Sequence, residues 1–432
     1  MRASYFPTWI EKRSGVIAPD ERLPWSEALP LGVQHVIAMF GATVLAPLLM
    51  GFDPNVAILM SGMGTLIFFV IVGGRVPSYL GSSFAFIGVV IAATGYPGSG
   101  PNANVGVALG GIIACGVVYA IIGLVVMAAG TQWIERAMPP VVTGAIVAVI
   151  GLNLAPIAVK GATATAFDAW MALLTVLCVA FVAVFMRGML QRLPILIGLV
   201  LAYVIYAALT NGAGLGKAID WSGVAQAAWI GLPRFAAPAW SGPAIALIAP
   251  VAIVLVAENL GHIKAVSAMT GRNLDPYMGR AFLGDGVATI AAGSVGGTGV
   301  TTYAENIGVM AVTRIYSTLL FVVAAVIAIV LGFSPKFGAL IQTIPVPVLG
   351  GVSIVVFGLI TVAGARIWVQ SGVDFGDNRN LVVTAVTLVL GAGDFTLRIG
   401  SFALGGIGTA TFGAVILYAL LGLGSGRSAP NV

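Results

Sequence analysis

The sequence predicts an all-α, multi-pass membrane protein. Of the 432 residues, 59% are hydrophobic and only 8% are charged, whereas about a quarter of the residues of a soluble domain are charged. The apolar residues form long runs separated by charges, prolines and glycines. Because a membrane-spanning helix needs about 20 residues, the chain has room for about 12 to 14 spans with short loops. An ordinary soluble fold is excluded.

Fourteen apolar runs can be read along the chain. They lie near residues 31–50, 56–73, 78–95, 105–130, 139–158, 169–186, 194–212, 243–263, 281–296, 298–313, 316–333, 346–365, 380–397 and 402–423. Residues 1–30 contain eight charged side chains and no apolar core, so we expect an N-terminal tail and no cleavable signal. Residues 424–432 form the expected C-terminal tail.

The positive charges predict the orientation. An even number of spans puts both termini on one side of the membrane, and fifteen of the 20 Lys and Arg residues then fall on that side. Lys and Arg concentrate in cytoplasmic loops, so both termini are predicted to be cytoplasmic. The same bias explains the net charge of +5, and no nucleic-acid partner is expected.

Two of the fourteen runs are unsuited to continuous helix. Residues 78–86 read Ser-Tyr-Leu-Gly-Ser-Ser-Phe-Ala-Phe, and residues 293–303 are similarly rich in Gly, Ser and Thr, which are poor helix formers. Non-helical backbone at membrane depth is tolerated around a cavity lined by protein. Since the two breaks are the third span of each seven-span half, they predict the site of an inverted-repeat transporter. The alternative is that the glycines permit close helix packing.

Two carboxylates lie at membrane depth, where a charge costs roughly 2.5 to 3.5 kcal/mol. Glu258 is followed four residues later, on the same helical face, by His262. Glu305 follows the second break, and a half-helix beginning there would offer free backbone N–H groups. Carboxylates that accept and backbone N–H groups that donate suit a neutral planar ligand with N–H and carbonyl groups. A proton on a buried carboxyl group could be coupled to transport. The alternative is an ion pair of Glu258 with Lys264 or Arg314.

Other polar residues inside the spans allow two interpretations each. Gln34 and His35 would form hydrogen bonds between helices or contact the ligand, and Asp285 would belong to a proton path or pair with a nearby base. Cys115 and Cys178 lie in apolar runs and are expected to be small buried residues, not a disulfide or metal pair.

Several function classes find no support in the sequence. With two histidines and no cluster of ligand-type residues, no metal or other cofactor is expected. The chain contains no phosphate-binding loop ending in Gly-Lys-Ser/Thr, which disfavours ATP-driven transport, and no nucleophile motif of an enzyme. A channel remains a rival because broken helices also build pores, although no selectivity sequence is evident.

Residues 305–314, Glu-Asn-Ile-Gly-Val-Met-Ala-Val-Thr-Arg, match the signature of the nucleobase-ascorbate transporters (nucleobase-cation symporter family 2), [Q/E/P]-N-x-G-x-x-x-x-T-[R/K/G]. The resemblance runs from about residue 16 to 423. It includes the Gln34-His35 pair of span one, residues 81–86 of span three, and the span-eight pair Glu258 and His262, which is similar to that of uracil permeases.

The resemblance implies a fold and a set of site residues. The fold would be two inverted seven-span repeats, with a core domain of residues 31–130 and 243–333 and a gate domain of residues 139–212 and 346–423. Glu258 and Glu305 would bind a pyrimidine ring, Phe84 and Ala304 would add backbone contacts, and His262 would join Glu305 in proton coupling. Gln34, His35, Asn306 and Asp285 are further candidates, with structural or site roles.

The resemblance also implies a function. Purine carriers of the family commonly have Gln where this chain has Glu305, which favours the uracil branch. Uracil permeases often have Gly where this chain has Ala304, which bears on the size or orientation of the bound ring. The expected protein is a homodimeric, proton-coupled importer of uracil, and of thymine, in the bacterial cytoplasmic membrane. The alternatives are a xanthine or urate symporter, or a nucleobase facilitator or channel.

Overall fold

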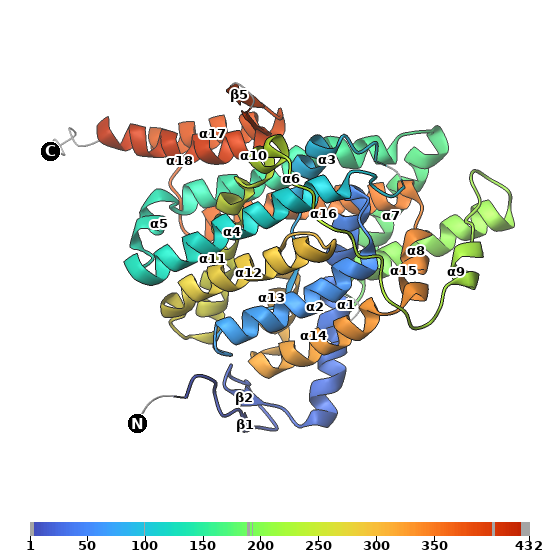
Figure 1. Ribbon diagram of the computed structural model, residues 1–432, viewed down its shortest axis with the longest axis horizontal. Coiled ribbons are helices and arrows are strands. Elements are labelled where there is room, and N and C mark those ends of the chain that lie inside the picture. The colour runs from blue at the N-terminus through green and yellow to red at the C-terminus, as the bar shows by residue number, and fades with distance from the viewer. Residues whose placement is uncertain (1–3, 99, 188–190, 192, 400–401, 425–432) are drawn as a thin grey trace.

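The computed structural model describes residues 4–98, 100–187, 191, 193–399 and 402–424, and this part of the chain is mostly helical (Figure 1). The helices are α1 Trp25–Met50, α2 Pro54–Ile71, α3 Ala85–Thr94, α4 Val105–Ala129, α5 Gln132–Ala137, α6 Pro140–Ala162, α7 Ala166–Phe185, α8 Pro194–Ala207, η2 Ala208–Gly212, α9 Ser222–Gln226, α10 Gly242–Ile248, α11 Val251–Thr270, η3 Asp275–Tyr277, α12 Met278–Val295, α13 Ala304–Thr313, α14 Thr318–Gly332, α15 Pro335–Gln342, α16 Val346–Gln370, α17 Asn378–Ala392 and α18 Gly406–Gly424. The strands are β1 Ile10–Glu11, β2 Glu21–Arg22, β3 Leu80–Ser82, β4 Val300–Thr302, β5 Leu397–Ile399 and β6 Phe402–Leu404.

Nine of the described helices or helix pairs are long and apolar enough to cross a membrane, and a tenth is α14 with α15 if this pair, bent by 81°, is counted as one. The helical membrane class is therefore confirmed. Each of the fourteen predicted runs coincides with a helix, but α3 and α13 have only 10 residues each. Since about 20 residues are needed to span the hydrocarbon layer, these two helices cannot cross it alone, and the fourteen-span layout stays a prediction.

The first helix starts earlier than its predicted span. It begins at Trp25, directly after Pro24, and not near residue 31. The residues before it are also ordered: β1 pairs in parallel with β2, and Ile17 forms an isolated bridge with Ile315. This N-terminal segment therefore lies against the end of α13 and the start of α14 (Figure 1).

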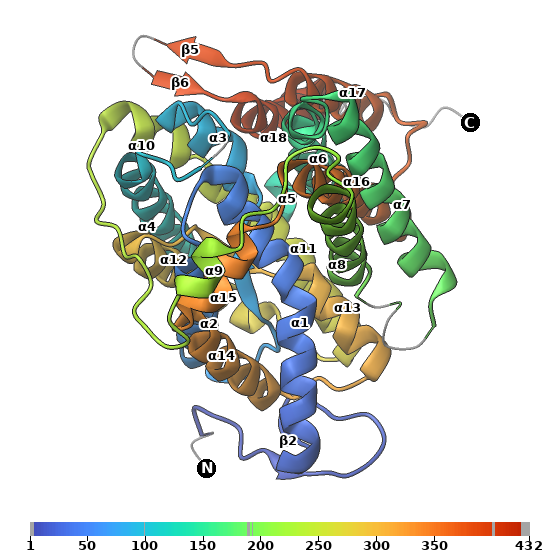
Figure 2. The same ribbon diagram turned by 90° about the vertical axis from the view of Figure 1, so that its right-hand side faces the viewer.

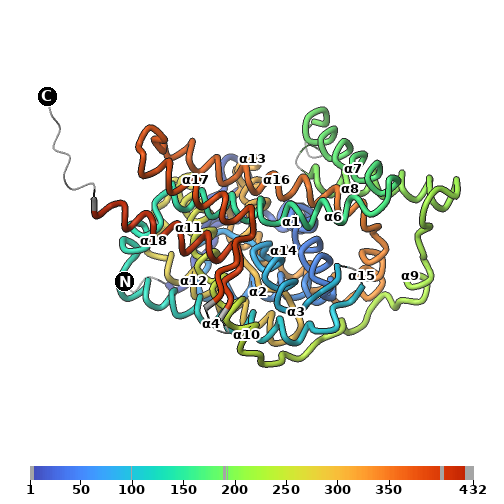
Figure 3. Tube along the Cα trace, turned by 90° about the horizontal axis from the view of Figure 1, so that it is seen from above, coloured from blue at the N-terminus to red at the C-terminus, as the bar shows by residue number. Residues whose placement is uncertain are grey.

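The long helices pack in two groups (Figure 2). In one group α2 contacts α12 and α14, and α4 contacts α12; in the other, α6 contacts α16, α17 and α18, and α7 contacts α8 and α16. Residues 213–241 connect α8 to α10 with little regular structure and run along the edge of the molecule (Figure 3).

The two breaks predicted in spans three and ten are short strands that pair with each other. β3 and β4 are antiparallel, with Leu80 opposite Thr302 and Ser82 opposite Val300. This pairing satisfies backbone groups that a broken helix would leave free at membrane depth. Gly81 is required here, because a Cβ atom at this position would come within 2.5 Å of the Tyr303 ring.

Candidate functional site

The strand pair positions the N-termini of two short helices. α3 begins three residues after β3, and α13 begins two residues after β4. Because the strands are antiparallel, the helices leave the pair in opposite directions with their N-termini nearest to it. Ser83 N–H donates to the Gly299 carbonyl (2.9 Å) and Tyr303 N–H to the Tyr79 carbonyl (3.0 Å). Other N–H groups of the first turns have no acceptor within their helix, and both positive helix ends lie here.

Glu305 lies in the first turn of α13 and is partly exposed. It lines a groove of about 460 Å³ between α1 and α13 on one side and α8 and α16 on the other. Arg366 of α16 lines the same groove, but none of the ion pairs within the described residues involves Glu305. The carboxylate is therefore available to a ligand that enters the groove.

Glu258 and His262 lie on α11, which packs against α13. Glu258 is thus on a helix in contact with the half-helix of Glu305, and its Oε2 atom is buried with no hydrogen-bond partner in the described residues. Lys264 instead pairs with Glu135 (2.9 Å) and Asp275 (2.7 Å). The alternative that Glu258 forms an ion pair with Lys264 or Arg314 is therefore not what the described structure shows.

A chain of buried polar side chains extends from His262 into the helix packing. His262 Nδ1 lies 2.9 Å from Thr302 Oγ1, which lies 3.2 Å from Asn259 Oδ1. The Asn259 amide nitrogen donates to the Tyr119 hydroxyl (2.9 Å) and to Asp285 Oδ2 (2.6 Å). Asp285 is fully buried. Of the two interpretations of Asp285, the ion pair with a base does not occur among the described residues, where its side-chain neighbours are an amide and a phenol.

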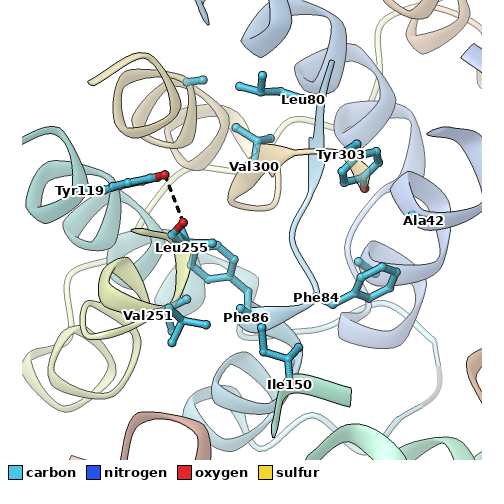
Figure 4. Packing of buried hydrophobic residues seen from close by; sticks show 14 of the residues in the cluster. Ala42, Leu80, Phe84, Phe86, Tyr119, Ile150, Val251, Leu255, Val300 and Tyr303 are labelled. Carbon is cyan, nitrogen blue, oxygen red and sulfur yellow. Dashed lines mark hydrogen bonds between the residues drawn. The ribbon is translucent and has the colours of Figure 1, made fainter. Parts of the chain in front are cut away.

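The sequence analysis did not single out three residues of this hydrogen-bonded network: Tyr119, Asn259 and Thr302. Asn259 gave a signal, because an amide in an apolar run needs a polar partner at membrane depth. Thr302 lies in the predicted break, which contains several Ser and Thr hydroxyl groups, and the sequence did not distinguish it from the others. Tyr119, whose hydroxyl also donates to the Leu255 carbonyl (3.3 Å, Figure 4), gave none.

Asn306 and His35 join α13 to α1. The Asn306 amide nitrogen lies 3.0 Å from His35 Nδ1 and 3.0 Å from the His35 carbonyl oxygen. His35 is 1% exposed and packs against Phe321, and Gln34 is also buried. These contacts correspond to the helix–helix hydrogen bond that was one of the two interpretations of His35.

Phe84 and Ala304 precede or begin the two half-helices. The Phe84 ring packs edge-on against Phe357 of α16, with 5.9 Å between the ring centroids, so it contacts the other group of helices. Ala304 is exposed. No group of three or more His, Cys, Asp or Glu residues that could hold a metal ion was found among the described residues.

A helical membrane fold in which two paired breaks hold two helix N-termini beside carboxylates defines a membrane transport protein. The family profile described as "Permease family" matches residues 26–400. The chain belongs to this family, that of the nucleobase-ascorbate transporters, and it is a permease and not an enzyme.

Curated relatives agree with this assignment. The chain is 70% identical over 420 residues to the "Putative pyrimidine permease RutG" of Escherichia coli K12, covering 96% of this chain and 95% of that protein. It is 44% identical to the "Uracil permease" of Paenibacillus larvae, covering 93% and 96%. It is 39% identical to the "Uracil permease" of Escherichia coli K12, covering 91% of each.

Solved structures of more distant proteins share the fold. The murine Slc26a9 anion transporter in its inward-facing state aligns with a TM-score of 0.66 at 12% identity, covering 94% of this chain and 69% of that chain. The transmembrane domain of the cyanobacterial bicarbonate transporter BicA aligns with a TM-score of 0.58 at 15% identity, covering 85% and 96%. At these identities the likeness concerns the fold alone.

Proposed function

We propose that the protein is a proton-coupled symporter that imports pyrimidine nucleobases, uracil first and thymine second, across the bacterial cytoplasmic membrane. The observation that carries this proposal is the arrangement of Glu258 and Glu305 beside the two half-helix N-termini. The names of the relatives, which are pyrimidine and uracil permeases, support the choice of substrate.

The site matches the polar edge of a uracil ring. A carboxylate only accepts hydrogen bonds, so Glu258 and Glu305 suit the ring N–H groups. Backbone N–H groups in the first turns near Phe84 and Ala304 are donors and suit the ring carbonyls, although Ala85 N–H already donates to Ser83 Oγ (3.3 Å). Since Ala304 is exposed, its methyl group limits how closely the ring approaches the backbone of α13.

Proton coupling follows from the carboxylates in this proposal. The two carboxylates lie on contacting helices at membrane depth, and one proton shared with the site would reduce the charge that has to cross the membrane. Glu305 and His262 are the groups assigned to carry that proton. Both side chains are partly exposed, and Glu305 lines the groove.

The proposed transport cycle is alternating access. A core domain of residues 31–130 and 243–333 would move against a gate domain of residues 139–212 and 346–423, within fourteen spans in two inverted repeats. The two packing groups of helices support this division. We also propose cytoplasmic termini and a homodimer joined through the gate domains.

Uptake of radiolabelled uracil into proteoliposomes, with and without an inward proton gradient, tests the proposal. We expect gradient-driven accumulation in the wild type and in the control Glu27→Gln, whose side chain is exposed in the first turn of α1. Glu305→Gln should lose accumulation. Equilibration without accumulation would indicate a facilitator, and a preference for xanthine over uracil in competition would indicate a purine symporter.

A further inference from the structure

In the network of polar side chains behind the site, the donor and the acceptor of each hydrogen bond can be assigned by counting the available hydrogens. At the buried end, Asp285 Oδ2 lies 2.6 Å from Asn259 Nδ2, and the Tyr119 hydroxyl lies 2.9 Å from the same nitrogen. Asp285 Oδ2 accepts when the carboxyl group is ionised or carries its proton on Oδ1. The Tyr119 oxygen also accepts, while its own hydrogen points to the Leu255 carbonyl (3.3 Å) or to Asp285 Oδ2 (3.4 Å). In that state both hydrogens of the Asn259 amide are used, and its nitrogen faces Asp285, as it does in the structure.

This orientation fixes the next link. With its nitrogen toward Asp285, Asn259 presents its carbonyl oxygen to Thr302, and a carbonyl oxygen can only accept. Thr302 therefore donates its single hydroxyl hydrogen to Asn259 Oδ1, at 3.2 Å. The Thr302 oxygen has only acceptor capacity left for its other neighbour, His262 Nδ1, at 2.9 Å.

We infer that Asn259 and Thr302 hold neutral His262 in the tautomer with its hydrogen on Nδ1, so that the lone pair lies on Nε2. In a His side chain the hydrogen bond made by one nitrogen decides the state of the other. Nε2 makes no hydrogen bond within the described residues, and the His262 side chain is partly exposed. Nε2 is therefore the atom of His262 that can receive a proton from the site.

Asn259 and Thr302 are positioning residues in this scheme, because they act through His262. The titratable groups around His262 include Glu258 and Lys264 on its own helix, Glu305 on α13, and Tyr119 and Asp285 at the buried end of the polar network. Glu305 is the acidic group on the neighbouring half-helix. The tautomer of His262 is inferred from the hydrogen bonds alone. Only the transfer of a proton to Nε2 during transport rests on the proposed function.

The second histidine provides an internal reference. Asn306 Nδ2 is bound to the His35 carbonyl oxygen, so this atom must be the amide nitrogen, and its other hydrogen goes to His35 Nδ1. His35 must then carry its hydrogen on Nε2. The chain has only these two histidines, and they are expected to be opposite tautomers.

Nitrogen NMR of the protein labelled with ¹⁵N-histidine and reconstituted in bilayers tests the inference directly, without uracil. At a pH where both rings are neutral, we expect one Nδ1–H and one Nε2–H ring, assigned to His262 and His35 with His35→Gln. Thr302→Val should abolish the Nδ1–H preference of His262, and Thr302→Ser, which keeps the hydroxyl, should restore it. Thr301→Val is the matched control, because the Thr301 hydroxyl has no partner in the described residues.

An Nε2–H ring at His262 in the wild type would overturn the inference, and so would an Nδ1–H preference that survives Thr302→Val. If Thr302→Val does not fold, Asn259→Leu should have the same effect on the His262 ring.

Uptake assays separate this inference from the proposed function. We expect Thr302→Val to bind uracil but to lower proton-driven accumulation roughly tenfold, about the worth of one hydrogen bond. A wild type with the Nδ1–H ring that transports no uracil would refute the proposed function alone.

Discussion

At the scale of single residues, Asn306 on α13 is hydrogen-bonded to His35 on α1 and so connects these two helices. Its amide nitrogen serves both a ring nitrogen and a carbonyl oxygen of His35, and each of these groups is buried. A hydrogen bond of this kind is worth about 1 kcal/mol when it forms, but a buried polar group left without a partner costs about 1 to 3 kcal/mol.

Asn306→Leu is therefore expected to lower the free energy of unfolding by about 2 kcal/mol or more. Thermal unfolding of the purified protein in detergent would measure this, with Gln226→Ala on the exposed face of α9 as the control. An unchanged midpoint in Asn306→Leu would mean that the His35 contact does not stabilise the protein.

Which side chains meet was only partly predictable from the sequence. Glu258, His262 and Glu305 could be proposed because ionisable residues in apolar runs are costly and so are conspicuous. Asp285 was equally conspicuous, but its partner was not, since the choice between a base and an amide depends on which helices pack together. The hydrogen-bond partners of Asn259 could not be predicted for the same reason.

At the scale of elements, glycines set the distance between α4 and α12. A Cβ atom added at Gly123 would clash with the backbone nitrogen of Leu283, and one added at Gly286 would lie 2.5 Å from the Ala120 nitrogen. Small residues at such positions let helix backbones approach closely in membranes. Asp285 lies on α12 beside Gly286, and Tyr119 lies on α4, so this approach also brings the two buried side chains together.

Gly123→Leu should push the helices apart and cost about 1 to 3 kcal/mol of stability, as overpacking does. Gly358→Ala on α16, where a Cβ atom would meet nothing within 4 Å, is the matched control. Both can be compared by the temperature of aggregation in detergent. Equal effects of the two substitutions would contradict the packing role of Gly123.

The N-terminal segment contacts the loop after α11 through Asp20 and Arg272, whose charged groups are 2.5 Å apart. Partial burial raises the pKa of Asp20, but the hydrogen bonds and the charge of Arg272 outweigh it, so the pKa lies below the ordinary value of an aspartate. A carboxyl group of lowered pKa stabilises the folded state above its unfolded pKa and loses this effect as the pH falls through its folded value. The contribution should therefore persist down to about pH 4 and disappear below it.

Hydrogen exchange of residues 9–22 tests this dependence. We expect their protection to fall when the pH drops below about 3.8, beyond the ordinary effect of pH on exchange. Asp20→Asn should show weaker protection at neutral pH and no such extra fall. The same fall in Asp20→Asn would assign the effect to another group.

The elements themselves were the most predictable part of the structure. Apolar runs gave the helices, because their length and composition are properties of the local sequence. The pairing of β3 with β4 could not be read in this way. Its partners are brought together by the packing of α2 and α12, which the sequence shows only as two apolar runs.

At the scale of the whole molecule, the distribution of Lys and Arg predicts the orientation in the membrane. Cysteine labelling tests it, since Cys115 and Cys178 are the only cysteines and can be replaced by alanine. In right-side-out vesicles an impermeant maleimide should label Ser222→Cys between α8 and α10, but not Asn273→Cys after α11. Labelling of Asn273→Cys alone would reverse the proposed topology.

The β3–β4 pair also has a consequence for biosynthesis. Ser82 and its partner Val300 are about 220 residues apart in the chain. At a synthesis rate of roughly 5 to 20 residues per second, β3 leaves the ribosome about 10 to 40 s before β4. During that interval the edge of β3 has no strand partner, and unpaired backbone is costly in lipid. The nascent first half must therefore stay in a hydrated or protein-lined environment, such as the insertion machinery, until the second half arrives.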